Sequence, residues 1–149
     1  MNLILYYLFV YLIEAIILWL YCNRIFTSRK NTFLSLLITI GMFSLLIPVA
    51  ILTNAALNAF CSFIVYLCCI VLNYDSKPVW ALFHALALTI LMALSEGLIA
   101  AAIPDITIYA FRDGNIHSSA FTFVILSKSV YLCISQLVTR IFSKDTGIS

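Results

Sequence analysis

Charged residues are scarce in this sequence. Its 149 residues include only eight Lys or Arg and six Asp or Glu, together 9% of the chain, whereas 64% of the residues are hydrophobic. Soluble domains carry about 25% charged residues, so this chain lacks the polar side chains that a water-exposed surface needs. The sequence therefore excludes a soluble fold. The net charge of +2 is also too small for a nucleic-acid-binding surface.

Glycine and the common catalytic motifs are scarce as well. Four glycines are too few for a phosphate-binding loop, and the chain contains neither an H-E-x-x-H nor a G-x-S-x-G motif. The five cysteines lie in apolar runs, and their odd number argues against a disulfide framework. Cys68 and Cys69 are adjacent and have no nearby histidine, which argues against zinc. We expect no metal, no cofactor and no enzymatic activity.

Long apolar runs make up most of the chain. A helix needs about 20 apolar residues to cross ~30 Å of hydrocarbon. The run from Asn31 to Tyr74 has no charge and would form a helix about 66 Å long, so it must fold back, with a turn near Thr53 and Asn54. We predict an all-α, polytopic membrane bundle in one domain, residues 1–149. Its five transmembrane helices are expected at about 3–22, 33–52, 55–72, 79–103 and 120–142.

Lysine and arginine are distributed unevenly between the two sides of these spans. One side would carry only Arg112. The other side would carry six: Arg24, Arg29, Lys30, Lys77, Arg140 and Lys144. Cytoplasmic loops have an excess of these residues, so we predict a multi-pass membrane protein with its N-terminus outside and its C-terminus inside. Met1-Asn2 is uncharged and no cleavage site follows, so we expect the first span to be retained.

Two charged residues in the last two spans are expected to form an ion pair. An ionisable side chain in the bilayer costs about 2.5–3.5 kcal/mol and needs a partner or a function. Counted from the outer ends of their helices, Glu96 and Lys128 lie about 10 and 12 Å deep. We predict that they pair, and that exchanging the two restores what either single neutralisation loses. The pair would either fix helix register or form part of a signal-transmitting contact.

Glu14 and His84 are the other ionisable residues within the spans. Glu14 lies about 16 Å into the first span, and we expect no opposite charge at its depth on the neighbouring spans. We predict a neutral carboxyl hydrogen bonded to a helix neighbour, with a proton relay as the alternative. His84 lies near the inner end of the fourth span, and we expect it to be a hydrogen-bonding helix partner rather than a ligand or a base.

With the predicted orientation, a signal from outside would meet the polar residues of the two outer connections. These residues form a candidate ligand region: Asn54, Asn58, Asp105, Arg112 and Asp113.

Four stretches carry a family resemblance: Leu18–Phe26, Met92–Glu96, Leu126–Tyr131 and Thr139–Lys144. Together they resemble the membrane sensor region of GHKL-type histidine kinases of Firmicutes, the class of the Agr quorum-sensing receptor. The resemblance implies a multi-helix sensor of a bacterial plasma membrane that receives a peptide or other extracellular signal and passes it to a cytoplasmic kinase. Relatives of this kind continue into a segment with a phosphoacceptor histidine and an ATP-binding domain.

This sequence departs from that pattern. Its two histidines are His84, in the membrane, and His117, expected outside, so neither is expected to be a phosphoacceptor. The leading hypothesis is a non-catalytic sensor domain in contact with lipid, a peptide ligand, and either a second copy or a full-length kinase. Two alternatives remain: a small transporter or substrate-binding membrane subunit, and a scaffold or decoy that pairs with a complete receptor.

Overall fold

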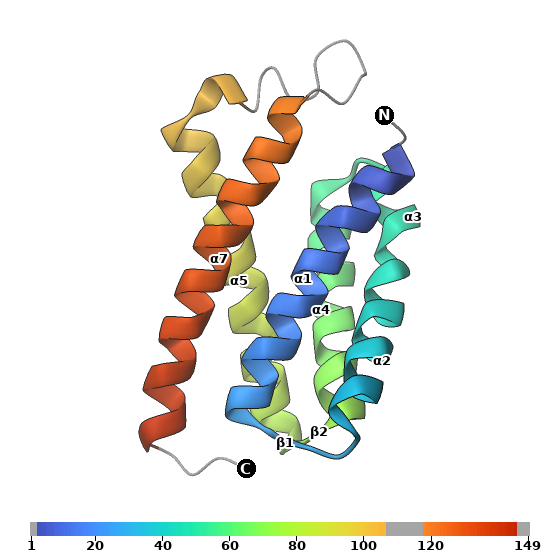
Figure 1. The fold of residues 1–149 in the computed structure, drawn as a ribbon, viewed down its shortest axis with the longest axis vertical. Helices are drawn as coiled ribbons and strands as arrows, with labels where there is room; N and C mark the ends of the chain where they lie inside the picture. Colours follow the sequence, from blue (N-terminus) through green and yellow to red (C-terminus); the bar gives the residue numbers. More distant parts are fainter. Residues whose placement is uncertain (1–2, 107–117, 146–149) are drawn as a thin grey trace.

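The computed structural model describes residues 3–106 and 118–145, and it is an all-α bundle (Figure 1). Five of its helical segments are long and apolar enough to cross a membrane, which confirms the predicted five-span architecture. The helices of these segments are α1 (Leu3–Ile25), α2 (Thr32–Ser44), α3 (Leu46–Ile51), α4 (Ala55–Asn73), α5 (Pro78–Ala102) and α7 (Ser118–Asp145). The second span, Thr32–Ile51, comprises α2 and α3.

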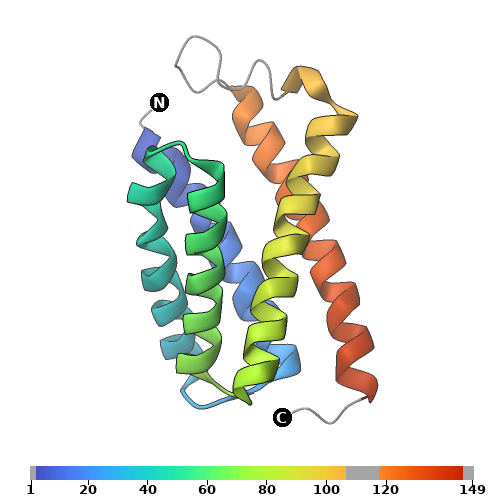
Figure 2. The same cartoon turned by 180° about the vertical axis from the view of Figure 1, so that it is seen from behind.

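The helices pack in a closed ring. Along the chain, α1 packs on α2, α2 on α4, α4 on α5 and α5 on α7, and α7 then returns to pack against α1 (Figures 1 and 2). The first and last spans are therefore neighbours. Because five spans are an odd number, α1 begins at one end of the bundle and α7 ends at the other.

The second span is broken at Leu45, where one continuous helix over 33–52 was expected. Pro48 explains the break, because proline has no N–H to donate to the carbonyl of Ser44 and its ring crowds that carbonyl. At the break, the Leu45 N–H bonds to the carbonyl of Met42, three residues earlier, at 3.2 Å. Two other helices are longer than expected, because α1 continues to Ile25 and α7 covers Ser118–Asp145.

The predicted turn after the second span is present at Thr53 and Asn54. Thr53 has a φ of 56°, in the left-handed region that β-branched residues rarely adopt. Asn54 then caps α4, because its side-chain oxygen accepts a hydrogen bond from the Leu57 N–H at 3.1 Å. This end of the bundle, where α1 begins and α3 meets α4, is called the cavity end below.

Two short strands close the opposite end, called the strand end below (Figure 1). They are β1 (Thr27–Ser28) and β2 (Tyr74–Asp75), an antiparallel pair in which Ser28 is opposite Tyr74. Burial raises the pKa of the Tyr74 phenol above its ordinary value. The hydroxyl therefore stays protonated, and it donates a hydrogen bond to Asn23 Oδ1 at 2.9 Å.

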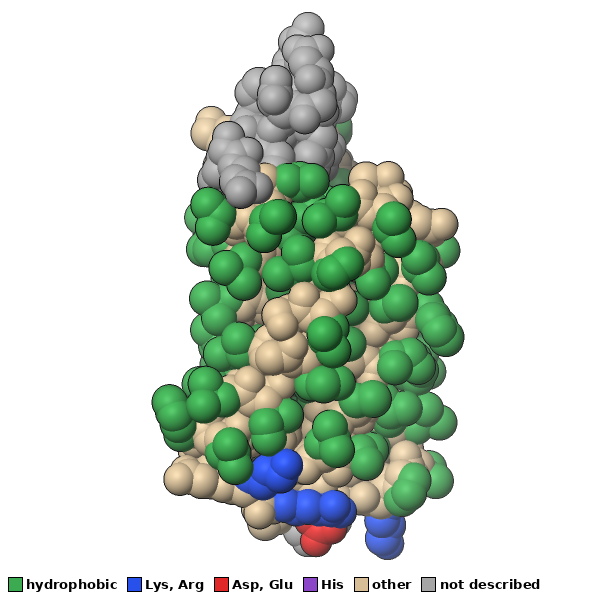
Figure 3. Space-filling model, turned by 90° about the vertical axis from the view of Figure 1, so that its right-hand side faces the viewer, with side chains coloured by type: hydrophobic (Ala, Val, Ile, Leu, Met, Phe, Trp, Pro, Cys, Tyr) green, Lys and Arg blue, Asp and Glu red, His purple; other side chains and the backbone are tan. Residues whose placement is uncertain are grey.

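The sides of the bundle are apolar. Large hydrophobic side chains such as Phe33, Phe60 and Val79 are more than 60% exposed. On the face drawn in Figure 3, hydrophobic side chains cover the wall, and the Lys and Arg side chains gather at the strand end. Lipid rather than water suits such a wall, and the chain is a multi-pass membrane protein.

Candidate functional site

The bundle contains a cluster of three charged residues from three helices. Lys128 of α7 places its Nζ 2.5 Å from Glu14 Oε1 of α1 and 2.6 Å from Glu96 Oε1 of α5. The side chains of Lys128 and Glu14 are each 3% exposed, whereas that of Glu96 is 41% exposed. The cluster therefore joins the last span to both of its neighbours, with Glu96 as the accessible member.

The predicted contact between Glu96 and Lys128 is present. The expectation that Glu14 has no opposite charge within reach is wrong, because α7 packs against α1 as well as against α5. Helix rise alone puts Glu14 about 4 Å deeper in the membrane than Lys128, and the long lysine side chain covers that difference.

Helical spacing brings both buried members of the cluster to inward faces. On α7, Val124, Lys128 and Tyr131 are all buried, at the i, i+4, i+7 spacing of a single helix face. On α1, Tyr11 and Glu14 occupy the corresponding inward face. These charged side chains thus lie on faces that point into the bundle, whereas in a soluble protein the charged face of a helix points to solvent.

A cavity of about 170 Å³ lies beside the cluster. Its wall includes Glu14, Glu96 and Lys128 together with Asn58 and Ser62 of α4. Three tyrosines and several further residues complete the wall: Tyr6, Tyr7, Val10, Tyr11, Met92, Phe123, Val124 and Ser127. Polar groups therefore converge on this space from all the long helices except α2.

Two polar atoms of this wall have no hydrogen-bond partner among the described residues. They are Glu14 Oε2 and Ser62 Oγ, and both are buried. Asn58, in contrast, is engaged, because Tyr11 donates a hydrogen bond to its Oδ1 at 2.9 Å. Buried polar groups are nearly always hydrogen bonded in native proteins, so the two unpaired atoms mark a place for an additional donor.

A wider pocket of about 510 Å³ lies at the cavity end, between α1 and the α3–α4 turn. It shares Tyr7, Asn58 and Glu96 with the smaller cavity, so the two spaces adjoin, and together they are called the polar route below. Thr53 and Asn54 also line it. Its wall is Tyr7, Ala50, Thr53, Asn54, Ala55, Asn58 and Glu96.

The candidate ligand region is thus brought together only in part. Asn54 and Asn58 line the wider pocket, whereas Asp105 is exposed and belongs to the described wall of neither space. Arg112 and Asp113 lie outside the described residues.

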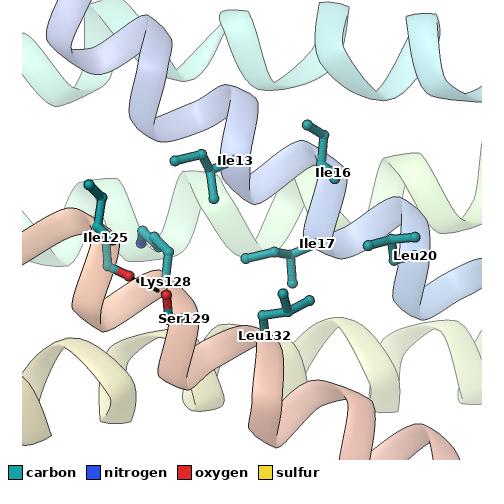
Figure 4. Close-up of a pocket in the computed structure, with 8 residues that line it drawn as sticks. All are labelled: Ile13, Ile16, Ile17, Leu20, Ile125, Lys128, Ser129 and Leu132. Atoms are coloured by element: carbon teal, nitrogen blue, oxygen red, sulfur yellow. Dashed lines mark hydrogen bonds between the residues drawn. The ribbon is translucent and has the colours of Figure 1, made fainter.

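An apolar groove of about 200 Å³ lies on the other side of Lys128, between α1 and α7 (Figure 4). Ile and Leu side chains of both helices form most of its wall. Ser129 at its edge already donates a hydrogen bond to the Ile125 carbonyl at 2.6 Å. Lys128 thus separates a hydrocarbon-lined groove from the polar cavity, and its amine is directed to the carboxylates.

His84 lies apart from the cluster, near the strand end. Its Nδ1 is 2.7 Å from the Tyr21 hydroxyl of α1, which fits its interpretation as a hydrogen-bonding helix partner. Its Nε2 is buried and has no partner among the described residues. Five aromatic rings surround the imidazole with centroids 5.2–6.1 Å away: Tyr21, Phe26, Trp80, Phe83 and Phe142.

Sequence reasoning missed Ser62 of α4 and the tyrosines of α1 at this site. The spacing of Tyr7, Tyr11 and Glu14 at i, i+4 and i+7 puts all three on one face of α1 and could have indicated these tyrosines. Ser62 carries no comparable signal. Within the described residues, no three His, Cys, Asp or Glu side chains are close enough to hold a metal ion.

Comparison of the chain with protein-family models, with curated proteins and with solved structures gives no match.

Proposed function

We propose that this chain is a non-catalytic sensor domain of a bacterial plasma membrane. It receives an extracellular peptide at the polar cavity and passes the signal through α7 to a cytoplasmic histidine kinase. The observation that carries the proposal is the position of Lys128, which holds α7 to α1 and α5 at the wall of that cavity. The resemblance to GHKL-type sensor regions supplies the class of partner.

The distribution of basic residues supports an outward-facing cavity. Arg24, Arg29, Lys77 and Arg140 all belong to segments at the strand end, and the described part of the cavity end has no Lys or Arg. The positive-inside rule places the strand end in the cytoplasm. The N-terminus is then outside, the C-terminus is inside, and α7 leaves the membrane on the kinase side.

The signal would travel as a change in how α7 is held. A ligand group that binds Glu96 or Glu14 competes with Lys128 for the same carboxylates. A ligand shifts a conformational equilibrium only by its difference in affinity for the two states, and here the difference is the strength of the α7 contacts. At the strand end, Phe142 of α7 packs against His84 with ring centroids 5.4 Å apart, so a movement of α7 also changes this contact.

Disulfide crosslinking in membrane vesicles tests this proposal. The α1–α7 pair is Leu20→Cys with Leu132→Cys, two residues that line the same groove. The matched α2–α4 pair is Thr39→Cys with Asn73→Cys, whose side chains are 3.3 Å apart. Both are made in a background in which the five native cysteines are replaced by alanine. The probe is the peptide fraction of spent culture medium.

The receptor proposal expects the peptide fraction to change the extent of α1–α7 crosslinking and to leave α2–α4 crosslinking unchanged. Identical α1–α7 crosslinking with and without the fraction, at all peptide concentrations, contradicts it. An equal change in both pairs also contradicts it, because that result indicates a general loosening of the bundle.

A small transporter is the second candidate, favoured by the polar route that reaches the middle of the bundle. Transport requires continuation of that route to the strand end. Beyond the cluster, the fully buried side chains of Tyr66, Leu88 and Tyr131 occupy the core. Uptake of a solute by vesicles, lost in Glu14→Gln, would favour the transporter. Copurification with a larger kinase would favour the receptor, or a scaffold that pairs with one.

A further inference from the structure

The wall of the cavity beside the cluster has two carboxyl groups and one amine. Lys128 supplies one positive charge, and Glu14 and Glu96 supply two negative charges, so the formal balance of the three ionised groups is −1. The described wall contains no other Lys, Arg, Asp or Glu. In a low-dielectric site such an imbalance is costly unless a proton or another cation accompanies it.

The unpaired atoms of the wall are acceptors or can act as acceptors. Glu14 Oε2 is a carboxylate oxygen, and Ser62 Oγ is a hydroxyl oxygen on a fully buried side chain. A buried polar atom left without a partner costs about 1–3 kcal/mol. Both costs disappear when a group with several N–H donors enters the cavity.

We propose that the cavity binds a primary ammonium group of the ligand, as found at a peptide N-terminus or on a lysine side chain. This inference rests on the proposed function and names the chemistry that the sensor recognises. An ammonium has three donors and no acceptor, which suits Glu14 Oε2, Ser62 Oγ and the exposed Glu96 carboxylate. Its charge brings the formal balance of the site to zero.

The shape of the route also fits this ligand. Glu96 is shared by the wide pocket and the smaller cavity, so an entering ammonium meets this carboxylate first and then Glu14. Tyr6, Tyr7 and Tyr11 line the smaller cavity, and aromatic rings attract cations. The wide pocket, of about 510 Å³, accommodates the next part of a peptide.

The binding test uses three probes with the same four-carbon chain and different head groups: butylammonium chloride, butan-1-ol and sodium butyrate. Each is titrated into the purified full chain in lipid nanodiscs, at constant potassium chloride concentration, and binding heat is measured by calorimetry. We expect butylammonium to bind at least about tenfold more tightly than butanol, a difference of ~1.4 kcal/mol, and butyrate to show no saturable binding.

Equal affinity for butylammonium and butanol overturns the inference, because the cavity would then recognise only the hydrocarbon chain. Displacement of butylammonium by sodium chloride, but not by potassium chloride, also overturns it and identifies the site as a sodium site. Failure of butylammonium to bind has the same consequence.

Four variants locate the binding. Glu96→Gln keeps the buried Glu14–Lys128 pair and is expected to weaken butylammonium about tenfold while butanol binding is unchanged. Ser62→Ala removes a hydroxyl that has no partner among the described residues, and it is expected to weaken butylammonium about threefold without loss of stability. The matched controls are Asp105→Asn, an exposed carboxylate outside both spaces, and Ser129→Ala, a hydroxyl in the apolar groove.

The controls are expected to bind butylammonium as the parent chain does. If Asp105→Asn weakens binding as much as Glu96→Gln, the attraction belongs to the general surface charge and the inference fails. The crosslinking experiment separates this inference from the receptor proposal. The chain could bind no butylammonium while the peptide fraction still changes α1–α7 crosslinking. That result would support the receptor proposal and overturn the ammonium inference.

Discussion

The two ends of the bundle use buried polar residues in different ways. At the cavity end, Lys128 and two carboxylates adjoin open space, and two polar atoms of that space lack partners among the described residues. At the strand end, aromatic rings enclose His84, and a pair of short strands ties the segment after α1 to the segment after α4. The first arrangement leaves two acceptor atoms open to a further donor, whereas the second holds helix ends together.

This difference has a physical basis. The charged cluster depends on Coulomb attraction in a low-dielectric interior, where the removal of one charge leaves the others unbalanced. The strand end depends on ring packing and short hydrogen bonds, each of which contributes about 0.5–1.5 kcal/mol. Substitutions at the cavity end should therefore have larger and less local effects than substitutions at the strand end.

The largest effect is expected for Lys128→Met. This change removes the ion-pair partner of the buried Glu14 carboxylate, and the loss of one member of a buried pair costs about 3–5 kcal/mol. The free energy of unfolding, measured by denaturant titration in detergent micelles, should fall by that amount. Lys77→Met, at the strand end, is the control and should lower it by less than about 0.5 kcal/mol. Equal losses would contradict the comparison.

Charge exchange provides a sharper test of the cluster. From the sequence alone, exchanging Glu96 with Lys128 was expected to restore stability. With Glu14 also bonded to Lys128, that exchange leaves the buried Glu14 carboxyl facing a second carboxyl at position 128, with the amine at position 96. Exchanging Glu14 with Lys128 keeps one buried pair of amine and carboxyl and brings the two like charges together at positions 96 and 128, where Glu96 is 41% exposed, so it should recover more of the loss. Equal recovery by the two exchanges in the same titration would contradict the three-residue cluster.

An intermediate effect is expected for Tyr21→Phe at the strand end. The change leaves His84 Nδ1 without the hydroxyl at 2.7 Å and should cost about 1–3 kcal/mol of unfolding free energy. Tyr66→Phe is the matched control, because the Tyr66 hydroxyl donates to Met92 Sδ, at 3.1 Å, and a thioether is a weak acceptor. A loss for Tyr21→Phe no larger than that for Tyr66→Phe would show that the hydrogen bond to His84 contributes little.

The spans could be predicted from the sequence because their signal is local. Runs of about 20 apolar residues are visible without tertiary structure, and all five were found. The break at Leu45 was missed although Pro48 was visible, since the proline was taken to mark the turn that follows. The strands β1 and β2 have two residues each, too few for any alternating pattern.

The site could be predicted only where it joins neighbouring spans. Depth along a helix gave the contact of Glu96 with Lys128, because α5 and α7 are consecutive spans. The contact of Glu14 with Lys128 depends on the closure of the ring between α1 and α7, and no residue pattern within one helix states which distant helix packs beside it. The unpaired state of Ser62 depends on the volume left between four helices, which is a property of packing alone.

A smaller effect, of opposite sign, is expected for Thr53→Gly at the edge of the wide pocket. Thr53 has a φ of 56°, a conformation that costs a residue with a Cβ about 1 kcal/mol and costs glycine little. The Thr53 N–H keeps its 3.1 Å bond to the Ala50 carbonyl, so the chain should gain up to about 1 kcal/mol of unfolding free energy. Thr53→Val, equally branched, should give no gain. A loss in Thr53→Gly would show that the side chain, not the backbone, sets this turn.

The smallest effect is expected for the ion pair at the strand end. Arg29 Nη2 lies 3.3 Å from Asp75 Oδ1, and their side chains are 51% and 75% exposed. Exposed pairs contribute about 0.2–1 kcal/mol and are screened by salt. In a double-mutant cycle of Arg29→Ala and Asp75→Ala, the coupling energy should be at most about 0.5 kcal/mol and should vanish in 1 M salt. A coupling as large as that of Glu14 with Lys128 would mean that burial does not set the strength of these pairs, because burial is what most distinguishes the two.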